Sequence, residues 1–116
     1  MYKRQDNKVS IGGNSDITID GRHRIYINKS NTPNNDYTIQ VGTGANVNIQ
    51  VDSGDVNIVT VQGKMNLNSG GDFNLKVGGT MTFDVAGDMN TNVAGTNTEN
   101  TTGAKTIRGY TIDLNP

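Results

Sequence analysis

The sequence predicts an all-β chain, assembled as an intertwined homotrimeric triple-stranded β-helix (β-prism) with an irregular β N-terminal collar. Three observations predict this class. The 116-residue chain holds 17 Asn, 14 Thr and 15 Gly but only three Leu, a composition that disfavours helices. Glycine recurs at every eighth residue in the second half of the chain. Between those glycines, apolar and polar residues alternate, which is typical of strands.

Octads in strict register run from residue 63 to residue 108. Their glycines are Gly63, Gly71, Gly79, Gly87, Gly95 and Gly103. Even offsets from each glycine are mostly apolar, and odd offsets are mostly Asn, Asp, Lys or Thr, so each octad is expected to have one buried and one wet face. Each glycine predicts a sharp corner, where a positive φ or crowding excludes a Cβ atom. The predicted core consists of Met65, Leu67, Phe73, Leu75, Val77, Met81, Phe83, Val85, Met89 and Val93.

The equivalence of the octads favours several chains over one. Three side chains per octad are too few to offset the ordering entropy of eight residues, so stacking must supply the rest. A single-chain β-solenoid with three short sides needs about 18–24 residues per coil, and its repeat would usually show at that longer period. Three identical chains wound about one axis explain the shorter period directly and leave no strand edges unpaired. The single-chain solenoid stays open as the alternative.

The stretch "VGGTMTFD VAGDMNTN VAGTNTEN", residues 77–100, resembles a known repeat. It is similar to the Val-x-Gly octapeptides in the C-terminal triple-stranded β-helix of contractile-tail phage baseplate spikes and tail lysozymes, related to type VI secretion spikes. The resemblance covers residues 45–116 and is strongest over 61–108. It implies a membrane-puncturing needle in the virion, at the tail baseplate, attached to a hub protein and in transient contact with the host membrane. There is no room for OB-fold and lysozyme domains, so a stand-alone spike or an excised needle is expected.

The N-terminal part alternates without the eight-residue period. Strand-like pieces such as "DITID", "RIYIN" and "DYTIQV" are separated by turn-rich pieces such as "DGRHR" and "NKSNTPNNDY". Residues 1–44 are therefore predicted to form the irregular β collar, and residues 45–116 the needle. The collar is interpreted either as the part that attaches to the hub or as a folded N-terminal cap.

The C-terminal end changes register. Tyr110, Ile112 and Leu114 alternate in the opposite parity to the octads, so the register slips by one residue near Gly109. This end is predicted to close the prism, with Pro116 stopping strand addition. Some spikes of the resembling family hold iron at the apex through a His-x-His motif, which this sequence lacks. The resemblance therefore implies a small PAAR-type tip protein that docks on Tyr110, Ile112 and Leu114.

Polar residues occupy part of the predicted interior, at Asn97, Glu99 and Lys105. Three carboxylates inside a narrow core repel one another and are poorly solvated. The predicted outcomes are a Glu–Lys network, trapped water or a bound ion. The plainer interpretation is a wet polar core that serves stability alone.

Charge and residue inventory disfavour several classes. The net charge is −1 without a basic stripe, which predicts no nucleic-acid partner, and the absence of cysteine excludes disulfides and Cys-type zinc sites. His23, the single histidine, is a weak metal ligand candidate. The carboxylates lie singly on outward positions except at Glu99, and no Ser-His-Asp set is evident. The sequence therefore predicts no enzyme, no catalytic residue, no cofactor and no metal.

The predicted function is structural. The chain is expected to be the central spike (needle) of a contractile phage tail baseplate, which mechanically pierces the host cell envelope during infection. The alternative is a receptor- or glycan-binding segment of a trimeric tail fibre. Aromatic residues would favour that alternative, but the chain has only four Tyr and two Phe, and both Phe are predicted to face inward.

Overall fold

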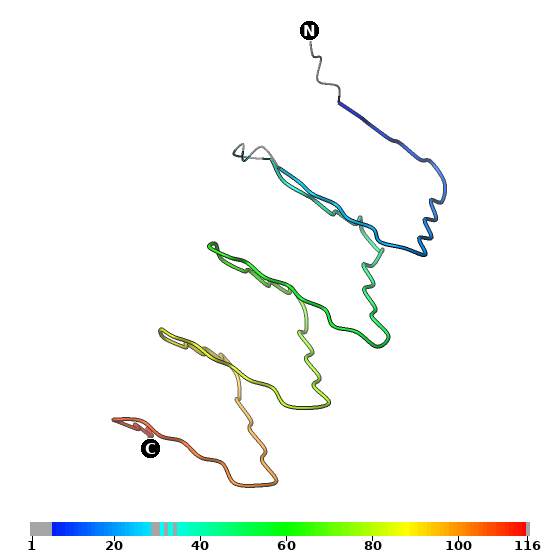
Figure 1. Ribbon diagram of the computed structural model, residues 1–116. Coiled ribbons are helices and arrows are strands. Elements are labelled where there is room, and N and C mark those ends of the chain that lie inside the picture. Colours follow the sequence, from blue (N-terminus) through cyan, green and yellow to red (C-terminus); the bar gives the residue numbers. More distant parts are fainter. Residues whose placement is uncertain (1–5, 29–30, 32, 34, 116) are drawn as a thin grey trace. The chain divides into compact units, whose positions relative to one another are not determined.

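The computed structural model describes residues 6–28, 31, 33 and 35–115 (Figure 1). These residues contain no helix and no β-strand, and none of them is buried. The backbone is extended over short segments that are separated by bends. The alternating sequence therefore favours extended backbone, as expected for β-branched and polar residues in alternation, without forming a core.

The prediction of an all-β fold, a triple-stranded β-helix with a β collar, is wrong. A strand belongs to a sheet only when a neighbour lies about 4.7–4.9 Å away and exchanges backbone hydrogen bonds with it. In the described residues, backbone groups bond each other only from Asn31 N–H to Asn28 C=O (3.0 Å) and from Ala45 N–H to Gly42 C=O (3.2 Å). Alternation makes each segment extended, but the described part of the chain supplies no second segment to pair with it.

The single-chain solenoid is also wrong. Residues about 18–24 positions apart would lie beside each other in such a fold, in consecutive coils. In the part of the chain that the structure describes, Cα atoms of residues twelve or more positions apart are never within 8 Å of each other. The contacts among these described residues are therefore local in sequence.

The chain divides into two units, Met1–Val61 and Gln62–Pro116. Neither unit has a buried residue among those described. The predicted domains, a collar over 1–44 and a needle over 45–116, stay a prediction, because local contacts alone do not define a folded domain. Pro116, expected to stop strand addition, lies outside the described residues.

Unit Gln62–Pro116 is a series of equal extended segments. Bends lie at residues 61–63, 70–71, 78–79, 86–87, 94–95 and 102–103. Five of these bends, from 70–71 to 102–103, are spaced by eight residues, and six-residue extended segments lie between them (Figure 1). The Ser69 hydroxyl donates to the carbonyl oxygens of Asp72 (2.9 Å) and Gly71 (3.3 Å) at the first of the five. The chain thus bends at each of the six octad glycines.

The conformation at the octad glycines differs from expectation. Gly44 has the positive φ (81°) among the described glycines, at the third position of a turn closed by the Ala45–Gly42 hydrogen bond, as a type II turn requires. At Gly71, Gly79, Gly87 and the later octad glycines, φ is not left-handed, and an added Cβ would meet nothing within 4 Å. Neither positive φ nor crowding within one chain explains the repeated glycine.

The described residues of unit Met1–Val61 are extended but bend at less regular intervals. They bend at residues 12–13, 20–21 and 52–54 and turn at 43–44. Asn28 and Asn31 have positive φ values of 60° and 58°, a conformation that Asn tolerates better than most residues. The irregular spacing of these bends follows the irregular spacing of Gly, Asn and Ser in this part of the sequence.

Candidate functional site

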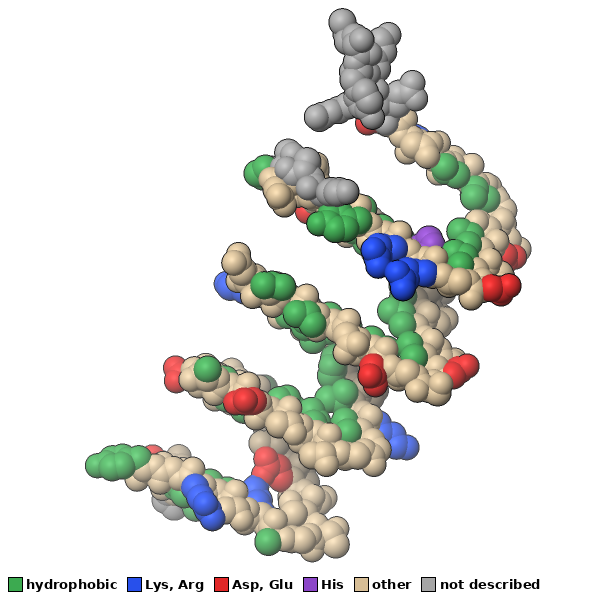
Figure 2. Space-filling model, in the orientation of Figure 1, with side chains coloured by type: hydrophobic (Ala, Val, Ile, Leu, Met, Phe, Trp, Pro, Cys, Tyr) green, Lys and Arg blue, Asp and Glu red, His purple; other side chains and the backbone are tan. Residues whose placement is uncertain are grey.

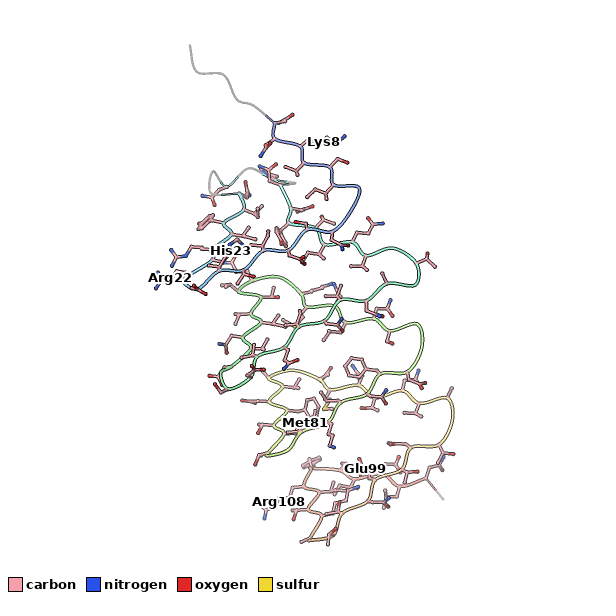
Figure 3. The ribbon with its side chains drawn as sticks, turned by 90° about the vertical axis from the view of Figure 1, so that its right-hand side faces the viewer. Lys8, Arg22, His23, Met81, Glu99 and Arg108 are labelled. Carbon is pink, nitrogen blue, oxygen red and sulfur yellow. The ribbon has the colours of Figure 1, made fainter. Side chains whose placement is uncertain are left out.

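The predicted core residues form an uncovered apolar face along unit Gln62–Pro116. We call the ten predicted core side chains, from Met65 to Val93, the apolar face. Their exposed fractions run from 43% at Val77 to 77% at Leu67. Apolar side chains follow the segments in the space-filling view (Figure 2), and Figure 3 labels Met81 among them. Within one chain the apolar face therefore has nothing packed on it.

The exposed area shows how much surface the chain leaves open. Its accessible surface is 13579 Å². A compact monomer of 12.4 kDa exposes about 6,100 Å². The chain thus exposes more than twice the surface of a compact protein of its mass, and this excess includes large apolar side chains in both units. Soluble proteins rarely leave so much apolar surface in contact with water.

The opposite face of the same segments is polar. Even-numbered positions carry charges at Lys64, Asp72, Lys76, Asp84 and Asp88, with Asn and Thr at most of the others. Because side chains alternate across extended backbone, each six-residue segment has one apolar and one polar side. The two faces are therefore suited to different surroundings, one to an apolar environment and one to water.

The polar positions of the predicted interior are partly brought together. The Lys105 ammonium group donates a hydrogen bond to Glu99 Oε2 and forms an ion pair with it. The two side chains come from the segments on either side of the bend at 102–103. Asn97 is exposed. The structure thus places Glu99 and Lys105 on the same side of the chain.

The C-terminal residues follow a further bend. Tyr110 lies at this bend, and Tyr110, Ile112 and Leu114 are all exposed. A Cβ atom added at Gly109 would lie 3.4 Å from the Thr111 carbonyl oxygen and 3.8 Å from Ile112 Cγ1. The change of parity in the sequence coincides with a change of backbone direction.

One feature of unit Met1–Val61 was missed at the level of sequence. Ile25, Ile27 and Tyr37 line an open hollow of about 390 Å³. Between Ile27 and Tyr37 in the sequence, the Asn35 side-chain amide donates a hydrogen bond to Asn28 Oδ1 at 3.1 Å. The alternation in "RIYIN" and "DYTIQV" on either side of an Asn-rich turn is the signal that indicates this approach.

The charged side chains that the structure describes in unit Met1–Val61 are exposed. Arg22 and His23 follow the bend at 20–21 and are exposed (Figure 3). The described residues contain no group of three or more His, Cys, Asp or Glu side chains that could hold a metal ion. Within the same described part, no helix has the length and hydropathy needed to cross a membrane.

Comparison with known proteins finds no match to a family model, to a curated protein or to a solved structure.

Proposed function

We propose that this chain is one protomer of a homotrimeric central spike in a contractile phage tail baseplate, and that the spike pierces the host cell envelope during infection. One observation carries the proposal. The chain repeats a six-residue extended segment and a bend every eight residues, and each repeat leaves its apolar side uncovered. A lone chain of this kind is an aggregation hazard, so other chains are required to cover it.

Copies of the same chain are the partners best suited to cover the apolar side of each repeat. Every octad from residue 63 to residue 108 carries the same glycine position, so a surface that fits one octad also fits the next. Identical copies related by a rotation axis then make the same contact at each level and close on themselves. The resemblance of the octads to contractile-tail spikes supports three copies.

The polar face suits a part that passes through a membrane without staying in it. Once the apolar face is covered, the outer surface consists mainly of Asn, Thr, Asp and Lys side chains from the even-numbered positions. Such a surface offers no apolar patch that lipid would hold. Contact with the host membrane is then brief, and force from the contracting tail, rather than lipid affinity, moves the spike.

Two partners belong to the proposal. A baseplate hub protein holds unit Met1–Val61, through the collar residues of its first 44 positions. A PAAR-type tip protein docks at the other end, where Tyr110, Ile112 and Leu114 are exposed after the last bend. The place of the protein in the virion would be the tail baseplate.

A segment of a trimeric tail fibre is the second candidate. The observation that favours it is the open hollow of Ile25, Ile27 and Tyr37, because ligand sites are concave and are lined mainly by apolar and aromatic side chains. The spike is preferred because the uncovered apolar side chains continue over both units, far beyond this hollow.

The position of the chain in its parent particle separates these candidates. We expect electron microscopy of particles labelled on this chain to show the label on the tail axis, below the baseplate. Labelling at a polar-face residue such as Asn90 avoids the apolar face. Label at the ends of peripheral fibres would contradict the spike and support the fibre segment.

A further inference from the structure

Glu99 and Lys105 interrupt an otherwise uncharged face. From Met65 to Ile107, every other odd-numbered residue is apolar, glycine or an uncharged polar residue. All other charged residues between 63 and 108 are at even-numbered positions. The side of the chain that includes the apolar face therefore carries charge at one level only, around the bend at 102–103.

The two charges are already paired within one chain. Lys105 donates to Glu99 Oε2 across the bend, and Glu99 is labelled in Figure 3. The side chains are 49% exposed for Lys105 and 59% for Glu99. Exposed ion pairs contribute little to stability, because water solvates both groups well. Stabilising the conformation of a single chain therefore does not account for this pair.

Covering the face changes what the pair does. When copies of the chain pack on this side, both charges lose water, and a buried charge without an opposite charge is strongly unfavourable. Each Glu99 then requires a Lys105 at the same level, from its own chain or from a neighbouring copy. An alignment that places all copies of the pair at one level gives each charge opposite charges on neighbouring copies as well as in its own chain.

The repeat itself does not fix that alignment. If one copy slips by eight residues, its octad glycines again lie level with octad glycines of the other copies. Met81 then takes the place of Phe73, and Phe83 that of Leu75, so apolar residues replace apolar residues. Along the length that the copies still share, such a slip keeps apolar side chains against apolar side chains, and its cost on this face is limited to the octad left uncovered at each end. At the charged level, however, the slip places Glu99 opposite Thr91 or Ile107 of a neighbouring copy. The pair then keeps only its contact within its own chain and is buried against uncharged side chains. Polar groups buried at one level fix register in other repetitive assemblies for the same reason.

We propose that the Glu99–Lys105 pair sets the register in which copies of this chain align. The proposal rests on the homotrimer of the proposed function and adds the residues that determine its alignment. The partner is a second copy of the same chain, recognised through an acidic and a basic group at one level of an otherwise uncharged face.

The absence of cysteine allows a direct test on the full chain. Asn90→Cys introduces one spin-label site on the exposed polar face, and pulsed electron spin resonance then measures the distances between labels on different copies. With Glu99 and Lys105 present, we expect a single narrow distance distribution. Replacing both charges by E99T/K105M, residues that other octads carry at equivalent positions, should add longer distances from slipped copies.

Two further variants complete the design. The exchange E99K/K105E keeps one acidic and one basic group at the level and should therefore keep the single distance. This variant tests the register role even if E99T/K105M does not assemble. Removing two outward charges, K76M/D84T, should leave the distances unchanged.

Three results overturn the proposal. A single distance in E99T/K105M, or loss of the single distance in E99K/K105E, overturns the register role alone. Absence of any distance between copies in the labelled chain with both charges intact overturns the homotrimer, and the register role with it.

Discussion

A chain carrying Phe83→Asp should fail to assemble and remain monomeric. Phe83 is exposed in the single chain, so the substitution removes no contact there, and its effect arises when copies associate. Loss of a buried Phe costs about 3–5 kcal/mol, and an uncompensated buried carboxylate adds several kcal/mol more. Each copy in the assembly carries the substitution at the same height along the axis, so these free-energy costs add together there. Light scattering coupled to size-exclusion chromatography measures the loss directly.

The matched control is Thr82→Asp. Thr82 is the neighbouring residue on the polar face, and a substitution on a solvated surface changes stability by about 0.5 kcal/mol or less. This variant should therefore assemble like the unmodified chain. Equal loss of assembly in both variants would mean that the odd-numbered side chains are not the ones covered.

Deleting one whole octad should preserve assembly, whereas deleting half an octad should abolish it. Removal of residues 80–87 joins two equivalent positions, so the bends stay eight residues apart. The deletion removes Met81, Phe83 and Val85, each worth about 1.5–3 kcal/mol on burial, and lowers the melting temperature of the assembly. Removal of residues 80–83 alone leaves alternation intact but places two bends four residues apart.

The comparison of the two deletions tests whether the eight-residue segment is the unit of packing. Circular dichroism melting and sedimentation of both variants supply the measurement. If the half-octad deletion assembles as well as the whole-octad deletion, the spacing of the bends has no role in association.

Much of the local structure could be predicted from particular residues. The spacing of Gly71, Gly79 and Gly87 is also the spacing of the bends, because glycine between two alternating segments is where the backbone changes direction most easily. The parity change at Gly109 likewise coincides with a bend at Tyr110. These features depend on a few neighbouring residues, which a sequence displays directly.

The fold class could not be predicted, for a physical reason. Alternation around Phe83 indicates that one side is apolar, but it does not supply the segment that pairs with the backbone or covers the ring. In the described residues no such segment approaches, and the chain is extended without being a strand. The octad glycines were expected to have a positive φ or a crowded Cβ position, and the described ones from Gly71 to Gly103 have neither within one chain. Sequence alone does not distinguish an open position from a crowded one.

The candidate site was predictable only in part. The parity of Glu99 and Lys105 indicates that both lie on one side, whereas their pairing across the bend depends on the angle of that bend. The hollow of Ile25, Ile27 and Tyr37 lies beside the hydrogen bond from Asn35 to Asn28, and alternation alone does not specify this approach of the two asparagines.

Sedimentation equilibrium of the full chain tests the central claim, that copies of this chain cover the apolar face, most directly. A trimer has a mass of about 37 kDa, three times the 12.4 kDa of one chain. We predict this mass over the whole accessible concentration range, because the uncovered surface of a single chain is too large for a stable monomer. A monomer of 12.4 kDa that unfolds cooperatively on heating would contradict the claim.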